Sequence, residues 1–190
     1  MPVQTVAATP SWYEAAFKGG VYEARETVGA FRDPDWPNRF EKHAKIIAGA
    51  LGNSLLCIEH IGSTSVPGLA AKPIIDILVV VPNSGSESTY LPQLEAAGYV
   101  LRIREPNWNE HRMFRTLNKD VHIHIYSAGC PEIQRNLAFR DRQRRSAEDR
   151  RRYEQVKREL AGKEWPDMNA YAQAKTDVIE SMIAASTSEN

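Results

Sequence analysis

Two short apolar stretches, at residues 55–61 and 74–81, flank a loop rich in Gly, Ser, Thr and Pro. Both stretches are dense in β-branched residues and end at Gly or Pro, which at this length favours strands over helices. Each contains one acid, Glu59 in the first and Asp76 in the second. Burying an ionised carboxylate costs on the order of several kcal/mol unless a partner, backbone donors or a cation compensates. The sequence therefore predicts a strand–loop–strand unit in which Asp76 needs a compensating group.

The loop between the two strands begins with three small residues, Gly62, Ser63 and Thr64. Small side chains allow backbone N–H groups to face an anion, and a short helix beginning near Thr64 would add its positive dipole end. This composition indicates a phosphate-binding loop. It is also typical of an ordinary tight turn, and the residues alone leave both interpretations open.

A second pattern lies in the predicted strand at 120–126, where His122, His124 and Tyr126 alternate with apolar residues. Alternation places these three side chains on one face, with the two imidazoles about 7 Å apart along the strand. Two such histidines share a metal if their rings converge. The alternative is a polar sheet face with hydrogen-bonded histidines.

Further strands are predicted at 99–103 and 111–117, and hydrophobic periodicity predicts helices at 36–51, 91–97, 132–144, 147–160 and 168–185. His43 lies beside the apolar stripe of the first helix and is interpreted as a surface or half-buried residue. The basic residues from Arg140 to Arg158 are interleaved with acids, which is typical of solvated helix faces. Lys175 is interpreted as an exposed helical lysine.

Length and charge limit the classes of partner. The 190 residues suffice for one domain, placed at 32–187, after a partly helical extension at 1–31 that serves as a lid, an interface element or packing on a sheet edge. The net charge is zero, so neither nucleic acid nor an anionic membrane is expected as a partner.

The sequence shows neither an apolar run of about 18 residues nor a secretory pattern, and its two cysteines form no metal-type pair. A cytoplasmic protein without a disulfide is therefore expected.

The words IEHIGSTSVPGLAAKPIIDI at 58–77 closely resemble the signature of the GrpB family, also called uncharacterised protein family 0157. The resemblance extends from about residue 32 to 183 through the words GYV, HRMFR, VHIHIY, LAFRD and YAQAKTDVIE. Members of this family look like the nucleotidyltransferase superfamily. The resemblance implies an α/β (α+β) fold, with a mixed sheet of about five strands and helices packed mainly on one side.

The resemblance also implies a site. Gly62, Ser63 and Thr64 would bind the phosphate of a nucleotide or phosphorylated small molecule, aided by Lys72 and by Arg140 from the word LAFRD. The superfamily uses two metal-binding acids separated by one residue; Asp76 matches the first, and Leu78 occupies the position of the second. Losing one acid weakens one metal position in two-metal chemistry.

His122 and His124 fall where the superfamily supplies a third acid, and they could replace the missing acids. The catalytic residues would then be Asp76, His122, His124 and Glu59, with Asp76 and His124 binding a divalent metal, Mg²⁺, Mn²⁺ or Zn²⁺. Two other readings remain open: a ligand-binding module without turnover, and a repurposed enzyme whose histidines perform acid–base chemistry on a small molecule.

Overall fold

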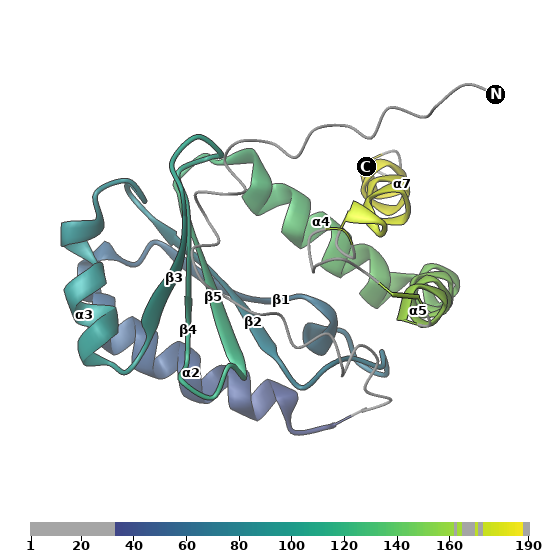
Figure 1. Cartoon of the computed structure of the whole chain (residues 1–190), viewed down its shortest axis with the longest axis horizontal. Coiled ribbons are helices and arrows are strands. Elements are labelled where there is room, and N and C mark those ends of the chain that lie inside the picture. Colours follow the sequence, from purple (N-terminus) through teal and green to yellow (C-terminus); the bar gives the residue numbers. More distant parts are fainter. Residues whose placement is uncertain (1–32, 162, 165–169, 171–172, 188–190) are drawn as a thin grey trace.

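The computed structural model describes residues 33–161, 163–164, 170 and 173–187 (Figure 1). The predicted extension at 1–31 lies outside these residues. The described strands form one five-stranded sheet in the order β1-β2-β5-β4-β3, with bounds β1 Cys57–Ile61, β2 Ile75–Val81, β3 Val100–Glu105, β4 His111–Arg115 and β5 Val121–Ser127. Only the pair β2 and β5 is parallel; the neighbouring pairs are antiparallel. The predicted mixed sheet of about five strands is confirmed.

One face of the sheet packs on helices α2 (Trp36–Leu51) and α3 (Leu91–Ala96). Alternate residues of the two central strands supply this core, among them Ile77 and Ile123, and both are fully buried. Trp36 begins α2 just after an Asp-Pro-Asp segment, and Ile47 is completely buried against the sheet. The apolar residues spaced along α2 therefore pack this predicted helix against the sheet.

The opposite face packs on α4 (Pro131–Arg145), so the expectation of helices mainly on one side is wrong. The reason is that β2 is apolar on both faces: Leu78 and Val80 point away from α2 and require a second cover. Ile133 and Leu137 of α4 provide part of that cover. Figure 1 shows α2 and α3 on one side of the strands and α4 on the other.

Helices α5 (Ala147–Ala161) and α7 (Thr176–Thr187) lie beyond α4 (Figure 1). Val66 and Leu69 from that segment are buried in a second core with residues from both helices, namely Tyr153, Val178 and Met182. The predicted helix at 168–185 is described as a helix from Thr176 onward, and residues 165–169 and 171–172 lie outside the described part. The C-terminal helices therefore anchor the loop that the sequence singled out.

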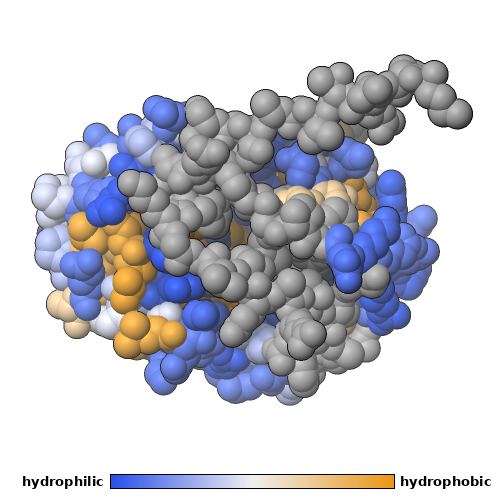
Figure 2. Space-filling view, in the orientation of Figure 1, coloured by the Kyte–Doolittle hydropathy of each residue, from blue (hydrophilic) through white to orange (hydrophobic). Residues whose placement is uncertain are grey.

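The visible surface over α5 is largely hydrophilic, as Figure 2 shows at its right edge, in agreement with solvated charged faces on this helix. Cys57 and Cys130 are half-buried free thiols. Among the described helices, none combines the length and apolar content needed to cross a membrane.

Candidate functional site

Asp76 and the two histidines are brought together by the parallel pairing of β2 and β5. In that register Asp76 is the direct partner of His122, and His124 follows on the same face. His122 Nδ1 lies 3.5 Å from Asp76 Oδ1, and His124 Nε2 lies 3.8 Å from the same oxygen. One donor atom from each of the three residues lies within 4.8 Å of the other two. The predicted convergence of these side chains is present.

The spacing of these atoms suits a metal ion. Ligands held about 2 Å from a tetrahedral ion lie roughly 3.3 Å from one another, close to the two distances to Asp76 Oδ1. The three side chains are between 25% and 29% exposed, so an ion can reach them from solvent. Within the described residues, Asp76, His122 and His124 form a cluster that can hold a metal.

The charge of Asp76 is maintained by its neighbours. Burial raises the pKa of Asp76, but the imidazoles of His122 and His124 oppose this effect and hold the pKa well below its ordinary value. A carboxylate that stays ionised at neutral pH is a competent ligand for a divalent cation.

Gly62 is fitted against Asp76. The residue has a φ of +69°, and a Cβ built on it would collide with the Asp76 carboxylate. Ile61 pairs with Asp76 across β1 and β2, so the first loop residue lies directly beside the acid. Glycine is needed here both for the backbone conformation and for the space that Asp76 occupies.

Directly after Gly62, residues Ser63–Ser65 form a single 3-10 turn, and the helix expected near Thr64 is limited to this turn. The Thr64 side chain is buried, and its hydroxyl donates to the Ile74 carbonyl at 3.0 Å and lies 3.1 Å from His60 Nε2. Ser63 is only half-buried. Of the two hydroxyls, Ser63 is therefore the one placed to meet a ligand.

Positive charge surrounds the loop. Lys157 of α5 donates to the Ala70 carbonyl at 2.6 Å and to Ser63 Oγ at 3.3 Å. Burial lowers the pKa of Lys157 to about 8, and the charge of Lys175 acts in the same direction. Burial likewise lowers the pKa of Lys175 to about 8, with Asp76 opposing and Lys72 reinforcing the shift. Lys175 therefore interacts electrostatically with Lys157, with Lys72 and with Asp76, and Lys157 itself lies beside Ser63.

These contacts correct two interpretations made from the sequence. Lys175 is half-buried and lies in a turn before α7, so it is not an exposed helical lysine. Lys157 is not on a solvated helix face, because its ammonium reaches the loop. Lys157 follows buried Tyr153 by one helical turn, and this spacing was the signal that could have identified it.

Glu59 and Arg140 bond to each other. Arg140 Nη1 donates to Glu59 Oε2 at 2.6 Å and to the His60 carbonyl at 3.1 Å, while Nε and Nη2 donate to Asp141. The Arg140 side chain is 9% exposed. The hydrogen bonds to Glu59 and His60 connect α4 to β1 at the edge of the site.

A cavity of about 290 Å³ opens beside Asp76 and His124. Gly62, Asp76 and His124 contribute to its sheet side, and residues of α4 and α7 form the rest of its lining. This volume lies near the lower end of ordinary small-molecule sites. His43 lies elsewhere, 2.7 Å from the Tyr99 hydroxyl, and is half-buried, as the sequence predicted.

Sequence reasoning did not include His111 and Glu105 in the site. His111 Nε2 lies 3.1 Å from His124 Nδ1, and His111 Nδ1 lies 2.6 Å from Glu105 Oε2. The two residues pair across β3 and β4. Only the word HRMFR hinted at His111, because its contact with His124 depends on how β4 and β5 pair.

Fold and site together define a mixed α/β protein with an Asp–His cluster, able to hold a metal, beside a glycine–serine loop. The GrpB protein family matches residues 30–185, and the chain belongs to this family. It is 52% identical over 151 residues to a UPF0157 protein of Halalkalibacterium halodurans, covering 80% of this chain and 77% of that protein. The crystal structure of conserved protein GrpB from Enterococcus faecalis is similar with a TM-score of 0.73 and 33% identity, covering 83% of this chain and 95% of that one.

A more distant relative has a different name. A dephospho-CoA kinase of Mycolicibacterium paratuberculosis is 26% identical over 170 residues, which cover 75% of this chain and 42% of that protein.

Proposed function

We propose that the protein binds a nucleotide or another phosphorylated small molecule together with a divalent cation, and that it catalyses metal-assisted group transfer. The observation on which this depends is the convergence of Asp76, His122 and His124 beside the Gly62–Ser63 loop. The name of the Mycolicibacterium relative, dephospho-CoA kinase, adds support for a nucleotide-related ligand.

Each part of the site has a separate task in this proposal. Asp76, with His124 and His122, holds the cation. When bound, the cation neutralises developing negative charge at a phosphorus or activated acyl centre. Ser63 and the lysines Lys72, Lys157 and Lys175 bind the phosphate oxygens. Two imidazole ligands favour Zn²⁺ or Mn²⁺ over Mg²⁺, which prefers oxygen ligands.

The test is a thermal-shift and calorimetric screen of Zn²⁺, Mn²⁺ and Mg²⁺, each alone and combined with ATP, CoA or dephospho-CoA. We expect one metal–ligand pair to raise the unfolding temperature more than either component alone, because ligands that bind only the native state stabilise it. Ser63→Leu should keep the fold and lose the ligand's effect, since the hydroxyl and the room for an anion are both removed. If Ser63→Leu binds the best ligand as tightly as the wild type, the loop is a simple turn.

Leu78 supports a second candidate, a binding module without turnover. It occupies the position of the second metal-binding acid and is completely buried with Ile61, Val80 and Tyr126. No second carboxylate is therefore supplied from that position of β2. Product analysis with the best ligand pair and candidate acceptors separates the two: turnover that Asp76→Asn abolishes indicates an enzyme, and tight binding without turnover indicates the module.

A further inference from the structure

His111 stacks directly behind His124. The two ring centroids are 5.3 Å apart with an interplanar angle of 15°, and His111 Nε2 lies 3.1 Å from His124 Nδ1. The second ring nitrogen of His124, Nε2, faces Asp76 and lies 3.8 Å from its Oδ1. His124 is thus held at one nitrogen while its other nitrogen faces the candidate metal site.

The proton positions follow from Glu105. An ionised carboxylate only accepts hydrogen bonds, so the 2.6 Å contact between Glu105 Oε2 and His111 Nδ1 places a proton on that nitrogen. In a neutral imidazole the second nitrogen is then an acceptor. His111 Nε2 therefore accepts from a proton on His124 Nδ1, which leaves Nε2 as the nitrogen of His124 available to a cation.

A second proton on His111 would make its Nε2 a donor. Burial and the charge of Arg112 oppose that proton and outweigh Glu105, which favours it. His111 is 5% exposed, and the buried guanidinium of Arg112 donates to the His111 carbonyl at 3.1 Å. Two adjacent positive charges in so little solvent are costly.

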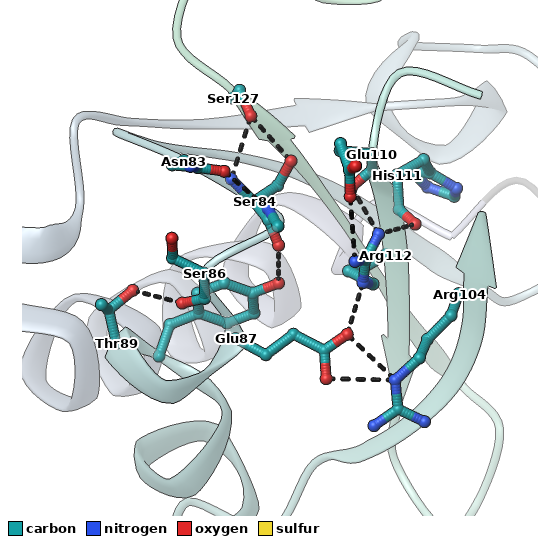
Figure 3. Close-up of polar contacts among 12 residues, drawn as sticks. Asn83, Ser84, Ser86, Glu87, Thr89, Arg104, Glu110, His111, Arg112 and Ser127 are labelled. Carbon is teal, nitrogen blue, oxygen red and sulfur yellow. Dashed lines mark hydrogen bonds and ion pairs between the residues drawn. The ribbon is translucent and has the colours of Figure 1, made fainter. Parts of the chain in front are cut away.

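The backbone that carries His111 is fixed as well. Figure 3 shows Arg112 bonded to the carbonyl and carboxylate of Glu110 and to Glu87, which also binds Arg104. Asn109 and Glu110 have φ values of +54° and +51°, so the chain reverses sharply just before β4. This reversal lets Glu105 and His111 face each other across the hairpin.

We infer that Glu105 and His111 are positioning residues that keep the proton of His124 on Nδ1 and so present its Nε2 to a divalent cation shared with Asp76. This inference rests on the proposed cation site. Partners behind metal-binding histidines commonly change metal affinity 10- to 100-fold, by fixing the tautomer and orientation of the ring.

The first test needs no metal. ¹⁵N spectra of the histidine rings at about pH 8.5, above the ordinary histidine pKa, report which nitrogen carries the proton. We expect His124 of the wild type to be protonated on Nδ1 and to lose this strong preference in His111→Phe, which keeps a stacking ring without a nitrogen. A His124 ring protonated on Nε2 in the wild type would overturn the inference.

The second test is calorimetric Zn²⁺ titration of His111→Phe and Glu105→Met. The matched control is His43→Phe, which removes a half-buried histidine that contacts the Tyr99 hydroxyl, away from the site. We expect about 10- to 100-fold weaker binding in the first two and no change in the control. Glu105→Met also covers the case in which His111→Phe does not fold. Wild-type affinity in Glu105→Met and in folded His111→Phe would overturn the inference. If the wild type binds no divalent cation, the proposed function fails, and the ring spectra still test the positioning.

Discussion

Arg140 on α4 donates a 2.6 Å hydrogen bond to Glu59 on β1, so two residues that the sequence assigned to the ligand site are partners of each other. The same guanidinium nitrogen also reaches the His60 carbonyl. One helix is thereby fastened to the strand that leads into the Gly62 loop.

Arg140→Met should lower the free energy of unfolding by about 2 kcal/mol. Removing one partner of a buried ion pair costs about 3–5 kcal/mol, and the loss expected here is smaller because the Glu59 side chain is 38% exposed. Denaturant unfolding measures this. The control is Arg158→Met, whose exposed pair with Glu154 should contribute less than about 0.5 kcal/mol. An Arg140→Met protein with wild-type stability but weaker phosphate binding would instead make Arg140 a ligand contact.

Asp76→Asn and His124→Ala should each weaken Zn²⁺ binding at least about 10-fold, because each removes a donor from one cluster. The double mutant should lose less than the sum of the two losses, since groups that act on one centre are not additive. Calorimetric titration of the three variants measures the coupling. Strictly additive losses would place the two residues in separate sites.

Gly62→Ala should displace the Asp76 carboxylate and weaken cation binding. Gly68→Ala is a matched control in the same loop: Gly68 has a φ of +76°, but a Cβ there meets nothing within 4 Å. Both variants should lose about 1 kcal/mol or more of stability through backbone strain. Only Gly62→Ala should also change Zn²⁺ affinity, and equal affinities in the two variants would contradict the close fit.

Lys157→Met should weaken binding of the phosphorylated ligand about 10-fold, whereas Lys163→Met, which alters an exposed lysine, should not. Affinity of the wild type should also fall as the pH rises through about 8, because Lys157 and Lys175 lose their charge there. Ligand titrations between about pH 7 and 9 measure both effects. A pH-independent affinity would remove the lysines from the site.

His60 should make stability depend on pH. Its ring stacks on Phe40, and burial lowers its pKa to about 4. The unfolded state binds a proton at His60 more readily than the folded state does. The contribution of His60 to the free energy of unfolding, up to about 3 kcal/mol, is therefore complete above about pH 6.5 and is lost as the pH falls through about 4. The measured unfolding free energy of the wild type should decrease by up to about 3 kcal/mol relative to that of His60→Phe as the pH falls across this window. Parallel curves would show that His60 does not titrate there.

The sequence by itself determined the strands, most of the helices and the family. Alternation of apolar residues is a local signal, so the strand–loop–strand unit around Asp76 and the shared face of His122 and His124 were predictable. The words around Gly62 were sufficient to identify the family and its mixed sheet.

Only the tertiary structure placed the supporting residues. The parallel pairing of β2 and β5 sets His122 beside Asp76, and the adjacent hairpin brings His111 behind His124. Lys157 reaches Ser63 from 94 positions along the chain. Such contacts depend on how whole elements pack, and a helical lysine directed at a loop has the same local sequence pattern as one directed at water. The sequence therefore predicted the three residues of the Asp–His cluster, and the packing of β4 and α5 places His111 beside His124 and Lys157 beside Ser63.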